Sequence, residues 1–226
     1  MRISIRRFIQ SDDAAYLSPM AAFLLLTWVG GNWPGLYPAS YVAKTIAAAG
    51  LLIYFRNHYT KIRWNYWWLG VLVGIVGVVQ WVGMEKGILH FWPNYPRQSV
   101  DIYNPHDHFN SAAAMWSFII FRWMGAALVV PFMEELFWRD YLWRTILAPN
   151  DFRLASIGEW DWRPFVIVSL LFATVHVQWM TAIVWGFMIA ALLVYTRSLG
   201  ACIIAHGVTN FLLGGYVLFT KNWYFW

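Results

Sequence analysis

Long apolar stretches recur along this chain, and they constrain its fold more than any other feature of the sequence. Inside a lipid bilayer the backbone N–H and C=O groups must be satisfied within the protein, so only helices and closed barrels cross it. A helix needs roughly 20 predominantly apolar residues to do so. We expect about seven hydrophobic segments, over Ala14–Val29, Ala39–Phe55, Tyr66–Met84, Ala112–Phe132, Pro164–Val177, Met180–Thr196 and Ala201–Phe219. The sequence therefore predicts an all-α fold, a polytopic membrane helix bundle.

The composition also indicates a membrane protein. Of the 226 residues, 60% are hydrophobic and 12% are charged, whereas soluble domains carry roughly 25% charged residues. The 17 Trp residues suit the membrane interface, where an amphipathic ring lies between acyl tails and headgroups. The net charge of +5 comes without a run of Lys and Arg, which argues against a nucleic-acid partner and for the lipid bilayer. The single cysteine, Cys202, excludes an internal disulfide and a Cys-rich metal site.

The fifth segment is shorter than the others, and only Gln178 and Trp179 separate it from the sixth. A stretch of this length is more typical of a re-entrant or internally buried helix than of a full crossing. We therefore expect the fifth segment to be re-entrant or internally buried and His176, near its end, to lie at membrane depth.

The distribution of basic residues predicts an orientation. Short connectors rich in Lys and Arg stay in the cytoplasm. Three regions are rich in basic residues and predict the same side. The N-terminal stretch, which we interpret as part of an uncleaved anchor, contains Arg2, Arg6 and Arg7. One connector contains Arg56, Lys61 and Arg63, and another contains Arg144, Arg153 and Arg163. The opposite connectors have no charge at Gly30–Pro38 and few basic residues at Glu85–Asn110. We expect a multi-pass protein of the cell membrane with a cytoplasmic N-terminus.

The first cluster of charged residues directly follows the fourth apolar segment. An ionisable group within a span costs about 2.5 to 3.5 kcal/mol, so such clusters are candidate functional sites. Glu135 and Arg139 are four residues apart, a helical spacing that favours an ion pair. Glu134 points about 100° away on the helix and lacks that partner, which makes it the better candidate general base. The alternative is that both glutamates are solvated charges at a helix end.

Two further clusters lie in otherwise apolar segments. Phe172 and His176 share one helical face, and so do His206 and Asn210. A single intramembrane histidine is readily explained as a core residue with its hydrogen bonds satisfied. Two histidines, an aligned asparagine and a pair of glutamates favour a functional site, because an imidazole and a carboxamide can donate to a developing negative charge.

Other polar residues are less informative. Arg122 falls near the middle of the fourth segment and must face protein or water. It either holds a substrate carboxylate or pairs with another helix. Lys44 can extend its ammonium group towards the membrane surface. The connector His106-Asp107-His108 is expected to be solvated rather than to bind a metal, because no further spaced pair of ligands accompanies it.

Taken together, the three clusters resemble the CPBP family, the CAAX proteases and bacteriocin-processing enzymes also called the Abi family. The resemblance rests on Glu134-Glu135-x-x-x-Arg139, Phe172-x-x-x-His176 and His206-x-x-x-Asn210, in that order on successive segments. It covers the chain from the fourth segment onward. We therefore expect one integral membrane domain over 1–226, in which 1–110 forms N-terminal helices without a signature and 111–219 forms the protease core. Asp140 departs from the family, since many members have Gly there.

The resemblance implies an all-helical intramembrane endopeptidase acting on a membrane-anchored peptide or protein. Glu134 and His176 would activate a water molecule, His206 and Asn210 would stabilise the oxyanion, and the supporting residues would be Glu135 and Arg139. Zinc bound by Glu and His is chemically reasonable, but the HExxH pattern is absent. We expect a mechanism without a metal or other cofactor.

Two other classes of function remain open from the sequence. A membrane scaffold or immunity factor would keep the polar residues for folding or for binding a partner helix. A proton-linked transporter would use Glu and His as a proton relay. Internal repeats would favour the transporter, and we find none in the sequence.

Overall fold

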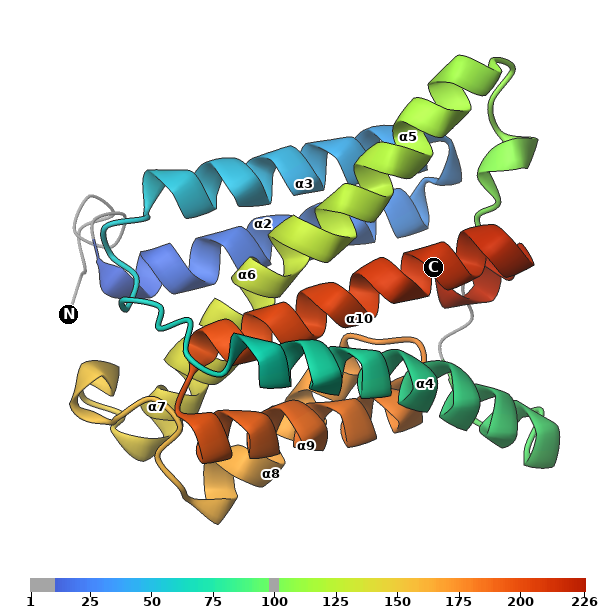
Figure 1. The fold of residues 1–226 in the computed structure, drawn as a ribbon. Helices are drawn as coiled ribbons and strands as arrows, with labels where there is room; N and C mark the ends of the chain where they lie inside the picture. The colour runs from blue at the N-terminus through green and yellow to red at the C-terminus, as the bar shows by residue number, and fades with distance from the viewer. Residues whose placement is uncertain (1–10, 98–101) are drawn as a thin grey trace.

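The computed structural model describes residues 11–97 and 102–226, and within these ranges all regular secondary structure is helical (Figure 1). The predicted all-α fold is confirmed. Arg2, Arg6 and Arg7, used above to predict the orientation, lie outside the described residues. The α-helices are α2 Asp12–Asn32, α3 Tyr37–Tyr54, α4 Trp67–Phe91, α5 Ala112–Met124, α6 Val130–Glu135, α7 Trp143–Leu147, α8 Trp162–Thr174, α9 Trp179–Thr196 and α10 Leu199–Thr220.

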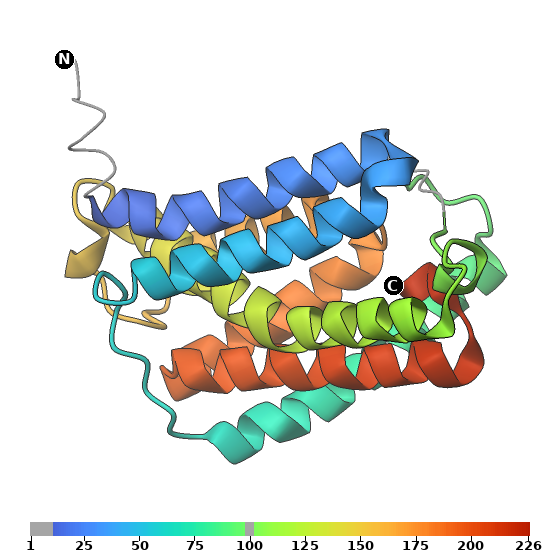
Figure 2. The same ribbon diagram turned by 90° about the horizontal axis from the view of Figure 1, so that it is seen from above.

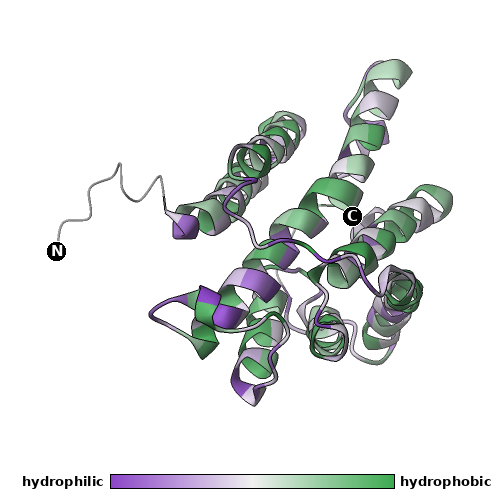
Figure 3. Cartoon of the chain, turned by 60° about the vertical axis from the view of Figure 1, so that its left-hand side comes forward, coloured by the Kyte–Doolittle hydropathy of each residue, from purple (hydrophilic) through white to green (hydrophobic). Residues whose placement is uncertain are grey.

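Within the described residues, six helices are long and apolar enough to cross a membrane, as expected of a multi-pass membrane protein. They are α2, α3, α4, the continuous helix Ala112–Leu147, α9 and α10. Hydrophobic residues lie along the helices, and hydrophilic residues gather mainly in the connecting segments (Figure 3). Helix α8 has 13 residues and measures about 20 Å, whereas the hydrocarbon core is about 30 Å thick. By length, α8 therefore does not span the membrane alone.

The fourth segment continues well beyond the predicted end at Phe132. Helices α5, α6 and α7 form one helix over Ala112–Leu147, in which π-helical turns at Gly125–Val129 and Leu136–Leu142 flank α6. Glu135, Arg139 and Asp140 do not end the helix, because their side chains are buried and paired inside the bundle. Asp140, for example, accepts hydrogen bonds from Tyr16 and Arg144.

The third segment is also longer than predicted. Helix α4 continues to Phe91, so Glu85 lies inside it rather than in a connector. The buried Glu85 carboxylate accepts hydrogen bonds from the hydroxyls of Tyr95, Thr181 and Tyr224, at 2.5, 2.8 and 2.5 Å. Burial and the hydrogen bond to Glu85 raise the pKa of the Tyr95 phenol to about 12. The phenol therefore stays protonated and acts as the hydrogen-bond donor to the carboxylate.

The helices associate in pairs that build the bundle. Helices α2 and α3 are antiparallel neighbours, α8 and α9 form a hairpin, and α4 runs parallel to α10 (Figures 1 and 2). Gly70 and Gly74 of α4 face α10, where a Cβ on either would meet the carbonyl oxygen of Ala201 or Ala205. The glycines therefore let the two backbones approach closely, as their GxxxG spacing indicates.

Candidate active site

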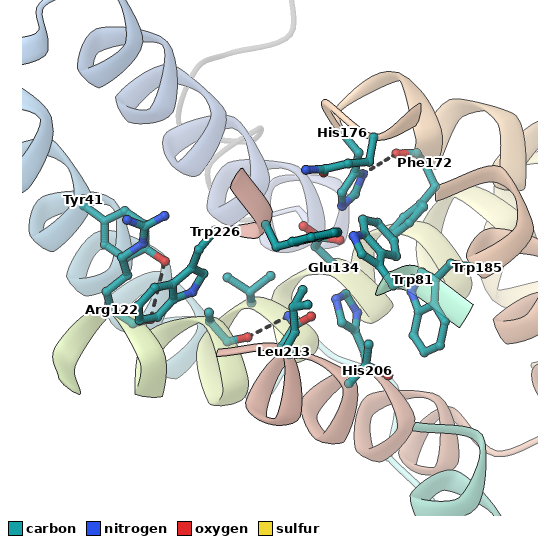
Figure 4. Close-up of a pocket in the computed structure, with 16 residues that line it drawn as sticks. Tyr41, Trp81, Arg122, Glu134, Phe172, His176, Trp185, His206, Leu213 and Trp226 are labelled. Atoms are coloured by element: carbon teal, nitrogen blue, oxygen red, sulfur yellow. Dashed lines mark hydrogen bonds between the residues drawn. The ribbon is translucent and has the colours of Figure 1, made fainter. Parts of the chain in front are cut away.

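A cavity of about 230 Å³ lies between the long fourth helix, the end of α8, and α10. The four side chains predicted to be catalytic all line it, although they come from three separate parts of the chain: Glu134, His176, His206 and Asn210. Figure 4 shows the first three of these around the cavity. The three sequence clusters therefore meet at one place in the fold.

Glu134 reaches the cavity from α6 and is 6% exposed. Its Oε2 atom has no hydrogen-bond partner, and the described residues form no ion pair with it. Burying a carboxylate without a partner is costly. The unpaired oxygen therefore indicates that Glu134 takes up a proton or binds water.

Glu135 is paired twice. Its Oε2 lies 3.3 Å from Nε of Arg139, in the predicted i, i+4 ion pair, and its Oε1 lies 2.8 Å from Nδ1 of His206. All three side chains are buried. Sequence spacing could not reveal the bond to His206, because 71 residues separate the two positions. Glu135 thus fixes the orientation of an imidazole that lines the cavity.

His176 is held by the end of its own helix. Helix α8 stops at Thr174, which leaves carbonyl groups of the last turn without helical partners. The carbonyl oxygen of Phe172 lies 2.8 Å from Nδ1 of His176. A carbonyl only accepts, so Nδ1 carries the hydrogen, and in the neutral ring Nε2 is the nitrogen with a free lone pair.

Asn210 contacts the first π-helical turn. Its Nδ2 donates to the carbonyl oxygen of Ala126 at 2.9 Å. Gly207 makes this approach possible, because a Cβ there would lie 2.9 Å from the carbonyl oxygen of Ala127. A carboxamide nitrogen has two hydrogens, so one remains for a group in the cavity.

Comparison with known families identifies the class of protein. Residues 116–212 match a family model described as type II CAAX prenyl endopeptidase Rce1-like. This segment is therefore an Rce1-like CAAX prenyl endopeptidase domain. The family is one of hydrolases, and its members act on proteins. No curated protein and no solved structure matches the chain.

The walls of the Rce1-like cavity are aromatic and include helices outside the matched segment. Trp81 of α4 and Tyr41 of α3 line it, together with Trp185 of α9 and the C-terminal residues Phe225 and Trp226. The ring of Trp81 contacts that of His176 edge-on, with centroids 5.6 Å apart. Sequence reasoning missed these walls, because a tryptophan in an apolar helix gives no signal that distinguishes a cavity wall from a lipid contact.

Two basic residues near the Rce1-like site are buried. Arg122 lines the cavity and is 3% exposed, which confirms that it faces protein. The side chain of Lys44 does not extend outward, since its ammonium group is buried. Its Nζ donates to Oγ1 of Thr27 at 3.0 Å and lies over the rings of Phe23 and Tyr41. Packing between α2 and α3 holds this side chain inward.

The donor set does not fit a bound zinc ion. A zinc site needs three or four His, Cys, Asp or Glu ligands around one point. Over 11–97 and 102–226, no three such side chains lie close enough to hold a metal. In this cavity Nδ1 of His176 and Nδ1 of His206 each contact a protein oxygen, so only Nε2 of each ring is free to bind another group. Asp107 of the connector accepts a hydrogen bond from Asn104.

Proposed function

We propose that this protein is an intramembrane endopeptidase of the CAAX-protease type, which hydrolyses a peptide bond of a membrane-associated protein or peptide. The observation that carries the proposal is the convergence of Glu134, His176, His206 and Asn210 on one cavity within the segment that matches an endopeptidase family. Among the described residues, neither a serine nor a cysteine lines this cavity, so water is the proposed nucleophile.

In the proposed reaction, water lies between the Glu134 carboxylate and Nε2 of His176. Glu134 takes one proton while the water oxygen bonds to the scissile carbonyl carbon. The tetrahedral intermediate then collapses, the C–N bond breaks, and the amine leaves with the proton that Glu134 returns. The unpaired Oε2 of Glu134 and the free nitrogen of His176 support these roles.

The oxyanion would be stabilised from α10. Asn210 donates through its second amide hydrogen. His206 already donates from Nδ1 to Glu135, so its Nε2 donates only while the ring is protonated. Glu135, which accepts the bond from Nδ1, fixes the orientation of that ring. Arg139, in contact with Glu135, would then have a supporting role.

We also propose a cytoplasmic N-terminus. Basic residues of α7 and of the α3–α4 and α7–α8 connectors gather at one end of the bundle, where Lys61, Arg63, Arg144 and Arg153 surround a common depression. The connector between α2 and α3, at the other end, carries no charge. This asymmetry supports a cytoplasmic position for the basic end.

The test is cleavage of an S-farnesyl peptide by protein purified in detergent or liposomes. We expect the wild type to cleave it and Glu134→Ala to abolish cleavage without a loss of folding. Glu159→Gln is the matched control, because Glu159 is exposed. Cleavage should persist in the presence of a zinc chelator. A scaffold or transporter would cleave nothing, and proton-coupled uptake into liposomes would identify the transporter.

A further inference from the structure

The basic end of the bundle has a depression of about 480 Å³. The α3–α4 connector, the α7–α8 connector and the turn between α9 and α10 surround it, and Figure 1 shows all three at the end where α2 begins. The described residues that line the depression include no Asp or Glu and five basic residues, Lys61, Arg63, Arg144, Arg153 and Arg197. The positive-inside rule accounts for basic residues at this end but not for their convergence on one hollow.

Three of these five cations have no counter-ion. Arg144 and Arg153 are each paired with an aspartate. Lys61, Arg63 and Arg197 are exposed, and their side chains form no ion pair or hydrogen bond with the described residues. A hollow lined by charges of one sign concentrates the electrostatic potential, so this depression attracts an anion.

The backbone around the depression is held in place without a ligand. The hydroxyl of Ser198 donates to the carbonyl oxygen of Asn65 at 2.8 Å, and the N–H of Gly200 donates to that of Arg63 at 3.1 Å. These bonds join the α3–α4 connector to the turn between α9 and α10. The guanidinium of Arg144 binds two carbonyl oxygens of the α7–α8 connector. The depression is therefore a preformed site.

An apolar groove of about 610 Å³ continues from the depression, since Thr60 and Lys61 line both. It lies between α3 and the fourth helix, and its apolar walls include Ala49, Leu52, Ile53, Leu128, Val129, Phe132 and Leu136. Residues 128–136 cover about 12 Å of the fourth helix. Ile53 and Leu128 are exposed, so the groove is open at the surface of the bundle. None of the described residues that line the groove or the depression also lines the cavity of Glu134.

We propose that the depression and the groove together bind one anionic phospholipid. Its phosphate lies among Lys61, Arg63 and Arg197, and an acyl chain lies between α3 and the fourth helix. Clusters of about four to eight Lys and Arg beside a membrane helix are typical of sites for anionic headgroups, and burial of methylene groups stabilises an acyl chain. An acidic peptide would pair with the cations but leave the groove empty. The site is separate from the active-site cavity, so this inference does not depend on the proposed endopeptidase function.

The test is thermal unfolding of the full chain in a nonionic detergent, titrated with three probes. Dioleoylphosphatidylglycerol and dioleoylphosphatidylcholine have the same acyl chains, and only the first has a net negative charge. Inorganic phosphate has the charge without the chains. We expect phosphatidylglycerol to raise the unfolding temperature in a saturable way, and the other two probes to raise it much less.

Two variants assign this response to the two parts of the site. The double variant Arg63→Gln, Arg197→Gln should raise the half-saturating mole fraction of phosphatidylglycerol by about 25-fold, at roughly fivefold for each basic residue. Ala49→Phe keeps every basic residue but fills the groove. It should raise the half-saturating mole fraction about tenfold, the effect of losing about two buried methylene groups.

The matched control is the double variant Arg163→Gln, Lys221→Gln, which removes the same number of charges from exposed positions outside the depression and the groove. It should respond to phosphatidylglycerol as the wild type does. An equal loss of response in this control would attribute the effect to net charge and overturn the site.

The wild type alone also tests the inference. Equal stabilisation by the two phospholipids would mean that the basic depression selects no headgroup, and an equal effect of inorganic phosphate would mean that no acyl chain is bound. Either result would overturn the proposal, as would a wild-type response in Ala49→Phe. If the Arg63→Gln, Arg197→Gln protein does not fold, the three probes on the wild type still decide.

Discussion

At the scale of single residues, adjacent glutamates have different surroundings. Glu134 has an unpaired oxygen at the cavity, whereas Glu135 is bound by Arg139 and His206. The ion pair with Arg139 could be predicted from the i, i+4 spacing. The bond to His206 could not, because it depends on how α10 packs against the fourth helix. The catalytic roles of both glutamates stay predictions.

The two glutamates should therefore respond differently to the same substitution. We expect Glu134→Gln to lower kcat by about 10²- to 10⁴-fold, the usual contribution of a general base, with little change in stability. Glu135→Gln should reduce the free energy of unfolding by about 3 to 5 kcal/mol, because Arg139 would be left buried without a counter-ion. Thermal unfolding in detergent and single-turnover cleavage measure the two effects. Activity lost only in a well-folded Glu135→Gln protein would reverse the assignment.

Asn210 should act on the transition state. Its amide is uncharged and gains strength as a donor only when the scissile carbonyl becomes an oxyanion, so Asn210→Ala should lower kcat by about 10²- to 10³-fold. KM should change little. Asn210 also bonds to Ala126, so thermal unfolding must accompany the kinetics. Unchanged single-turnover chemistry with weaker binding would make Asn210 a positioning residue instead.

At the scale of the elements, the number and order of the helices followed from the sequence, but two of their ends did not. Hydropathy predicted the end of the third segment at Met84 and of the fourth at Phe132, where charged residues begin. The structure continues both helices. Glu85 accepts three hydroxyl bonds, and Asp140 is bound by Tyr16 and Arg144. Such partners come from distant segments, so a hydropathy window cannot register them.

The contact between α4 and α10 depends on glycine at 74. A Cβ there would lie 2.7 Å from the carbonyl oxygen of Ala205, so Gly74→Ala should reduce the free energy of unfolding by about 1 to 3 kcal/mol. Gly83→Ala on the same helix is the control. Its Cβ would meet no atom within 4 Å, and alanine should raise helix stability by up to about 1 kcal/mol. Equal effects of the two substitutions on thermal unfolding would contradict this packing.

At the scale of the whole molecule, the N-terminal helices are part of the site's structure although they carry no sequence signature. Tyr41 and Trp81 line the cavity from α3 and α4. Helix α2 is bound to the far end of the fourth helix, where the Tyr16 hydroxyl donates to Oδ2 of Asp140 at 2.7 Å and accepts from the backbone N–H of Thr60 at 2.9 Å. Asp140, the departure noted in the sequence, therefore serves to hold α2.

The hydrogen bond between Tyr16 and Asp140 should contribute to stability but not to catalysis. Tyr16→Phe leaves the buried Asp140 with one donor fewer and should lower the free energy of unfolding by about 1 to 3 kcal/mol. Tyr54→Phe, at a position 71% exposed on α3, should change nothing measurable. Cleavage by Tyr16→Phe well below its unfolding temperature should match the wild type, because Tyr16 does not line the cavity. Reduced kcat in a fully folded Tyr16→Phe protein would instead mean that the docking of α2 sets the geometry around Glu134.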